Sequence, residues 1–222
     1  MPAPGMHSGV ATDEALNLSM SASAVPLFEA VREFIANEVD PITEEFYALG
    51  EGRSDRWSFA DGQLELLDGV KAKARAAGLW NFFLPDADTG EGLSNLDYAY
   101  IAAELGKSPL APECLNCSAP DTGNMEVLER VGTAEQKERW LKPLLDGRIR
   151  SAFAMAEPDV ASSDARNVAT SAVLDGDEWL INGEKFYISG AGDPRCEIMI
   201  VMVRTSPDGP PHQQQSQILV PM

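Results

Sequence analysis

Apolar residues recur at three- and four-residue spacing through the first two thirds of the chain, the pattern of amphipathic helices. In the first such stretch they are Leu27, Val31, Phe34, Ile35 and Val39. Pro26 suits a first helical position, whereas Pro41 lets this helix continue only with difficulty. Further helices are expected over 64–74, 94–105, 122–131 and 133–145, with loops at 50–61 and 107–120.

The pattern changes near residue 150. Short apolar stretches follow at 151–155, 168–174, 179–181, 186–188, 198–203 and 218–220. Asp175-Gly176 and Asn182-Gly183 separate consecutive stretches, and both pairs accept the positive φ of a type I′ hairpin turn. We therefore predict an α+β fold: an all-α domain over 25–149, then an antiparallel, β-barrel-like domain over 150–222.

The charge excludes several classes of partner. The chain has 17 Lys and Arg against 35 Asp and Glu, which gives a net charge of −18. Nucleic acids need a basic surface that displaces counterions, so we expect no nucleic-acid partner. The longest apolar run, Ile198 to Val203, is far shorter than the roughly 20 residues of a membrane-crossing helix. We expect no membrane span.

The N-terminal segment 1–24 is rich in Ala, Ser, Met and Gly and contains no Lys or Arg. We expect it to be disordered. It has neither the pattern of a secretory signal nor the basic residues of a mitochondrial presequence. The three cysteines, Cys114, Cys117 and Cys196, do not suggest a disulfide framework, so the simplest location is the reducing cytoplasm.

Several common motifs of chemistry are missing or ambiguous. The sequence contains no G-x-G-x-x-G, P-loop or G-x-S-x-G. Cys114 and Cys117 form a C-x-x-C, which fits a redox pair, half a zinc site or two ordinary buried thiols. His7 and His212 lie in segments expected to be flexible, and we predict two solvated histidines and no metal site.

Two segments carry more specific chemistry. Residues 153–164 form a strand that leaves into a loop, where Ser162 and Ser163 could bind a phosphate oxygen; the alternative is a simple polar turn. In the second segment, 182–192, alternation along a strand predicts Tyr187 and Ser189 on one face. An aromatic ring beside a hydroxyl suits a flat polar ligand, although an ordinary cross-strand pair has the same pattern.

Together these segments resemble the two signatures of the acyl-CoA dehydrogenase family. The first, aromatic–x–x–Thr–Glu–Pro followed by Gly–Ser–Asp, is matched by 153–164 with one extra residue. The second, Asn–Gly followed by Lys–x–Trp–Ile–Thr–Asn–Gly, is matched by 182–190. The resemblance covers about 25–222, and the loop 189–196 is similar to the branch of family members ten and eleven.

The resemblance implies an FAD-dependent oxidation of an acyl-CoA thioester to the 2,3-enoyl-CoA, as in fatty acid β-oxidation. In the family, a glutamate takes the α proton and the β carbon passes a hydride to the flavin. Electrons leave to electron-transfer flavoprotein. FAD lies between the β domain and a following helical bundle, and the full-length proteins form homo-oligomers.

Position by position, the resemblance implies that Phe153, Met155 and Ala156 line the flavin ring, mostly through backbone groups. Ala156 stands where the family has Thr, and the missing hydroxyl costs about 0.5–1.5 kcal/mol of binding free energy.

The resemblance also assigns the hydroxyl-bearing residues. Ser163 is expected near the flavin pyrophosphate and the acyl-CoA, with Ser162 beside it as a second cofactor-binding hydroxyl. Tyr187 takes the position of the family Trp against the isoalloxazine, and Ser189 that of the hydrogen-bonding Thr.

The family base lies in the C-terminal helical bundle, which is missing here, so we assign no catalytic residue. Glu157 matches the structural Glu–Pro of the signature. The chain stops at Met222 directly after an apolar strand, which suggests a truncated chain that is inactive alone. An acyl-CoA oxidase, a flavin monooxygenase of the same superfamily and a non-catalytic binding subunit remain open alternatives.

Overall fold

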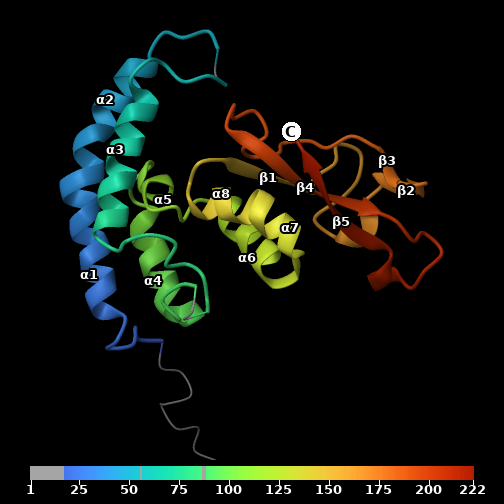
Figure 1. Cartoon of the computed structure of the whole chain (residues 1–222), viewed down its shortest axis with the longest axis horizontal. Coiled ribbons are helices and arrows are strands. Elements are labelled where there is room, and N and C mark those ends of the chain that lie inside the picture. Colours follow the sequence, from blue (N-terminus) through green and yellow to red (C-terminus); the bar gives the residue numbers. More distant parts are fainter. Residues whose placement is uncertain (1–17, 56, 87–88) are drawn as a thin grey trace, which may run out of the picture.

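The computed structural model describes residues 18–55, 57–86 and 89–222, and Figure 1 shows its two parts. Helices form the N-terminal part and a curled sheet forms the C-terminal part, so the expected α+β order is confirmed. The helices are α1 Val25–Phe34, α2 Asp40–Gly50, α3 Gln63–Ala76, α4 Asn95–Leu105, α5 Ala111–Cys114, α6 Asp121–Val131, α7 Ala134–Gln136 and α8 Lys142–Leu145. Within these described ranges, no helix is long and apolar enough to cross a membrane.

Two prolines lie inside continuous helical runs. A π-helical turn, Ile35–Val39, joins α1 to α2 just before Pro41, and a second, Lys137–Leu141, joins α7 to α8 just before Pro143. A proline clashes with the carbonyl four residues earlier, and in both cases that carbonyl lies within the widened turn. The π turns therefore let the chain pass through prolines that disfavour a regular helix.

The helices share one apolar core. Figure 1 shows α1 and α2 end to end in one helical run, with α3 alongside it and α4 and α5 next to α3. Val31, Val39, Leu67 and Ile101 are fully buried between these helices. Residues 18–24, the described end of the segment expected to be disordered, contact α4, since Ser21 N–H donates to Asp97 at 2.7 Å. Residues 1–17 lie outside the described part of the chain.

The sheet contains β1 Arg150–Ala154, β2 Ser171–Asp175, β3 Glu178–Asn182, β4 Cys196–Arg204 and β5 Gln215–Pro221. Its order is β1-β4-β2-β3, with β5 also paired to β4. The sheet is mixed, not antiparallel throughout as expected, because β1 runs parallel to β4. The chain makes the whole β2–β3 hairpin before it returns beside β1, and that long connection allows the parallel pairing.

One predicted hairpin is confirmed and one is wrong. β2 and β3 pair antiparallel, with Asp175 opposite Glu178, so the two turn residues are Gly176 and Asp177, one position later than expected. Asn182-Gly183 makes no turn, and 186–188 is not a strand. Gly183 lies so close to Thr170 that a Cβ at this position would collide with the Thr170 side chain. Gly183 therefore allows close packing here, and the chain continues as an irregular segment.

Candidate functional site

The loop that follows β1 is closed by its own hydrogen bonds. Phe153 is half-buried near the end of β1, and Ser162 is buried in the loop. The Ser162 hydroxyl oxygen accepts the Glu157 N–H at 2.8 Å. Asp164 accepts the Arg166 N–H at 3.0 Å and starts a short 3-10 turn. The oxygen of Ser162 therefore braces the loop, whereas Ser163 is exposed.

Glu157 ties this loop to two other segments. Its carboxylate accepts the backbone N–H of Ala169 at 2.7 Å and of Thr170 at 2.9 Å, and the Lys185 ammonium lies at 2.8 Å. Burial alone raises the pKa of Glu157, but the donors from Lys185, Thr170 and Ala169 outweigh it and lower the pKa to about 2. Glu157 is thus a buried, ionised brace, which agrees with its interpretation as a structural residue.

The two signature segments lie side by side. Lys185 Nζ also donates to the Met155 carbonyl at 3.1 Å, and the Phe186 N–H donates to the Ala156 carbonyl at 2.9 Å. These contacts join the end of β1 to the irregular segment that follows β3. The structure therefore brings Met155 and Ala156 next to the segment that carries Tyr187.

Tyr187 and Ser189 do not share a strand face, and that prediction is wrong. No strand forms there, because beyond the Phe186 bond to Ala156 the backbone turns back on itself, with Tyr187 at a φ of 52° and Gly190 at 85°. Tyr187 is 86% exposed, and its ring centroid lies 3.9 Å from that of Phe186.

The exposed hydroxyls leave room for a ligand. Within the described ranges, the side chains of Ser163, Tyr187 and Ser189 have no hydrogen-bond partner and face solvent. Free hydroxyls and an exposed aromatic ring are the groups that bind phosphate oxygens and a flat polar ring. The residues present thus fit a flavin nucleotide, apart from the hydroxyl that Ala156 lacks.

The cysteines behave as buried thiols. Cys114, Cys117 and Cys196 are all free and buried. Burial raises the pKa of Cys114 to about 12 and also raises that of Cys117, so both stay protonated at neutral pH. In the described part of the chain, His, Cys, Asp and Glu form no group that could hold a metal ion, and His212 is exposed. His7 lies outside the described residues.

A cluster of buried charges was not anticipated. We call Glu113 and its cationic partners Lys71, Arg150 and Arg195 the Glu113 cluster. It joins α3 and α5 to β1 and to the loop before β4. One sequence signal points to it: Lys71 lies on the apolar side of α3, between Val70 and Ala74, and its side chain is only 4% exposed.

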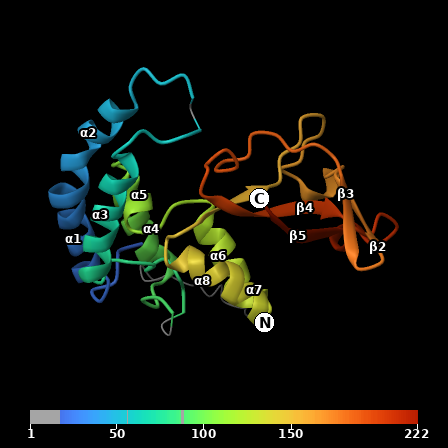
Figure 2. The ribbon, with the colours of Figure 1, turned by 45° about the horizontal axis from the view of Figure 1, so that its top comes forward.

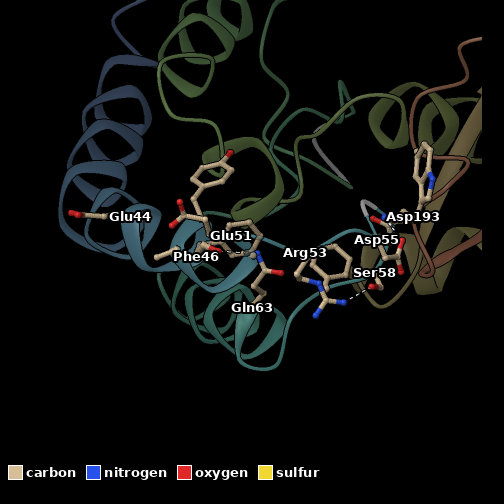
Figure 3. Close-up of a pocket in the computed structure, with 14 residues that line it drawn as sticks. Glu44, Phe46, Glu51, Arg53, Asp55, Ser58, Gln63 and Asp193 are labelled. Carbon is tan, nitrogen blue, oxygen red and sulfur yellow. Dashed lines mark hydrogen bonds between the residues drawn. The ribbon is translucent and has the colours of Figure 1, made fainter.

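A groove lies next to the loop before β4 and reaches the second signature segment at its last residue, Gly190. Its volume is about 870 Å³, and it runs from α2 past the α2–α3 connection to Gly190 and Asp193. Figure 3 shows Phe46 and Gln63 towards one end, and Asp55 and Asp193 at the other. None of the site residues predicted from the sequence lines it.

The fold is a helical domain that leads into a curled mixed sheet, with the two signature segments meeting at the end of β1. The chain belongs to the acyl-CoA dehydrogenase family. The family's N-terminal domain matches residues 23–148, and its middle domain matches residues 152–222.

Relatives agree with this assignment. The chain is 48% identical to acyl-CoA dehydrogenase family member 10 of Mus musculus over 91% of its length, and 48% identical to family member 11 of Homo sapiens over 86%. It is 47% identical over 93% of its length to FadE2 of Mycobacterium tuberculosis, which is assigned as an acyl-CoA dehydrogenase. The chain spans 50% of FadE2, 19% of member 10 and 24% of member 11.

Solved structures have the same fold. A Mycobacterium abscessus protein assigned as an acyl-CoA dehydrogenase is 51% identical, with a TM-score of 0.83 over 92% of this chain and 51% of that one. A glutaryl-CoA dehydrogenase from Mycobacterium smegmatis, solved in complex with FADH2, has a TM-score of 0.63 over 91% of this chain and 46% of its own. At 23% identity, the latter supports the fold alone.

Proposed function

We propose that this chain supplies the N-terminal and middle domains of an FAD-dependent acyl-CoA dehydrogenase, with residues 25–149 as the helical domain and 150–222 as the β domain. The observation that carries the proposal is the pairing of the two signature segments, through Lys185 to Met155 at 3.1 Å and Phe186 to Ala156 at 2.9 Å. This pairing brings Met155 and Ala156 next to the segment that carries Tyr187 and Ser189.

In this proposal the flavin ring lies against the end of β1. Phe153, Met155 and Ala156 meet it mainly through backbone groups, as the family signature implies. Tyr187 lies against the ring, and Ser189 donates a hydrogen bond to it.

In this proposal the phosphates of the ligands contact the loop that follows β1. Ser163 has a free, exposed hydroxyl that can donate to the flavin pyrophosphate and to the acyl-CoA. The Ser162 oxygen accepts the Glu157 N–H, and its own O–H proton remains free to donate to a phosphate oxygen.

The reaction we propose is the α,β-desaturation of an acyl-CoA, with electron-transfer flavoprotein as the electron acceptor. FAD, the cofactor of the family, accepts the hydride when it is bound. This chain's residues bind and orient the flavin and the thioester. Glu157 is an unsuitable base because three donors hold its carboxylate inside the protein. We therefore propose that the base lies outside these 222 residues and that the chain alone has no turnover.

The wider setting follows from the same proposal. We infer a role in fatty acid β-oxidation, a cytoplasmic location and assembly into a homo-oligomer when the helical bundle of the family is present.

The test is the visible absorbance spectrum of the chain after incubation with FAD and removal of free FAD by gel filtration. The proposal predicts a retained, shifted flavin spectrum, and a Tyr187→Ala/Ser189→Ala variant that retains less FAD. Retention of the same amount of flavin by this variant and by the wild type would contradict the assigned site.

A further inference from the structure

The segment 185–195 is held at its two ends, and between them Ile188 packs against the apolar core of the β domain. At its first end, Lys185 contacts Glu157 and the Met155 carbonyl within the β domain. The turns inside it are local, for example the Ala191 N–H to the Ile188 carbonyl at 3.3 Å. The Tyr187 and Ser189 side chains make no hydrogen bonds in the described structure. The positions of Tyr187 and Ser189 therefore depend on the packing of Ile188 and on how the two ends are held.

Arg195 holds the second end, and it does so against the helical domain. Its guanidinium donates to Glu113 on α5, with Nη1–Oε1 at 2.6 Å and Nη2–Oε2 at 3.4 Å. The same guanidinium donates to both carboxylate oxygens of Asp193, with Nε–Oδ1 at 3.0 Å and Nη2–Oδ2 at 2.8 Å. Its Cζ lies 4.6 Å from the centroid of the Phe59 ring. Such a guanidinium contact with two carboxylates fixes both the distance and the orientation of Arg195 relative to Glu113 and Asp193.

Glu113 is itself rigidly placed. Lys71 from α3 lies 2.9 Å from Oε1, and Arg150 from β1 lies 2.6 Å from Oε2. Arg150 also pairs with the buried Asp121 of α6. One carboxylate thus receives three cations from three different segments, and removing it leaves the buried Lys71 without its close partner.

We propose that Glu113 and Arg195 are positioning residues, which set the place of Tyr187 and Ser189 from the helical domain. This inference rests on the proposed flavin site. It means that the helical domain influences flavin binding through a residue that does not touch the flavin. Arg195 is connected to Ser189 by the chain itself, across the turns at Gly190 and Asp193.

The test compares the wild-type chain with Arg195→Gln, and with Arg148→Gln as the matched control. Arg148 has the same two-residue spacing from its partner Asp146 as Arg195 has from Asp193, and it lines the same pocket as Arg195, but it is exposed and makes no salt bridge to Glu113. Hydrogen–deuterium exchange should be about tenfold faster over 186–195 in Arg195→Gln and unchanged over α4 and β2, because only that end is released. Arg148→Gln should exchange like the wild type.

The second measurement is FAD affinity by fluorescence titration. Arg195→Gln should bind FAD about fivefold or more weakly, Arg195→Lys should lie between it and the wild type, and Arg148→Gln should be unchanged. Exchange over 186–195 at the wild-type rate, or an unaltered FAD affinity, would overturn the inference. A wild-type chain that binds no FAD would contradict the proposed function instead, and the exchange rates would then decide whether Arg195 holds the segment. Glu113→Gln provides an independent second variant with the same expectation.

Discussion

Two carboxylates organise most of the ion pairs around the candidate site: Glu157, which is buried, and Glu113, which is partly buried. For both carboxylates, burial alone raises the pKa, but the surrounding cations and donors outweigh this effect. For Glu113 these are Arg150, Arg195 and Lys71. For Glu157 the largest contribution comes from Lys185. Each pKa is lowered to about 2. Both groups are therefore ionised in the folded chain at any pH where it is stable.

This lowering predicts how the stability depends on pH. The folded-state pKa values of Glu113 and Glu157 lie below the ordinary value of 4.5, so protons bind more tightly to the unfolded chain. The stabilisation is present above about pH 4.5 and is lost as the pH falls towards 2, by up to about 3 kcal/mol for each group. Urea unfolding between pH 7 and the acid range checks this, and a free energy of unfolding that stays constant below pH 4.5 would contradict it.

Glu157→Gln should lower the free energy of unfolding by about 3–5 kcal/mol, because it leaves Lys185 buried without its carboxylate. Urea denaturation at neutral pH measures the change. Glu138→Gln is the matched control, since Glu138 pairs with Lys142 on the surface and its loss should leave stability unchanged. Equal effects of the two substitutions would refute the role given to Glu157.

At the scale of elements, the sequence predicts what local spacing determines and misses what distant contacts determine. Asp175-Gly176 correctly predicts the β2–β3 hairpin, because its turn geometry is local. Asn182-Gly183 has an equally good turn sequence, yet its glycine serves a contact with Thr170, which lies 13 residues earlier. The parallel pairing of β1 with β4 is also non-local and carries no sequence signal.

The candidate site likewise has local features that the sequence predicts and non-local features that it misses. The signature residues 153–157 and 185–189 are recognisable as motifs, and their proximity follows from the sheet. The Glu113 cluster is assembled from four separate segments, so only Lys71, a charge on an apolar helix side, gives a hint of it.

A pair of glycine substitutions separates close packing from helical propensity. Gly183→Ala should lower the free energy of unfolding by about 1–3 kcal/mol, because its Cβ would collide with Thr170. Gly69→Ala, in the middle of α3 where a Cβ meets nothing within 4 Å, should raise it by about 0.5–1 kcal/mol. Thermal or urea unfolding measures both, and changes of the same sign would contradict the packing described at Gly183.

At the scale of the whole molecule, the β2–β3 hairpin is the least protected part of the sheet. Figure 2 shows it at the end of the sheet away from α1 to α3. Val173 and Leu180 are paired on one face and Leu174 and Trp179 on the other, and these side chains are 45–63% exposed. An unpaired, apolar edge strand favours association between chains.

The double variant Val173→Thr/Leu180→Thr should therefore reduce self-association. Threonine also favours strands, but it exposes less apolar surface than the residues it replaces. Sedimentation velocity over a range of concentrations measures the effect. Val131→Thr is the control, since Val131 is 76% exposed but lies alone at the end of α6. If the double variant and the control both associate as the wild type does, the hairpin is not the surface that mediates self-association.

The central claim is that the flavin lies where the two signature segments meet. The most direct measurement is the change in backbone amide NMR shifts of the isotope-labelled chain on titration with FAD. The largest changes should fall on 153–157, Ser163 and 186–190, with smaller changes elsewhere. Changes concentrated in the groove between Phe46 and Asp55, with the signature segments unaffected, would contradict the site.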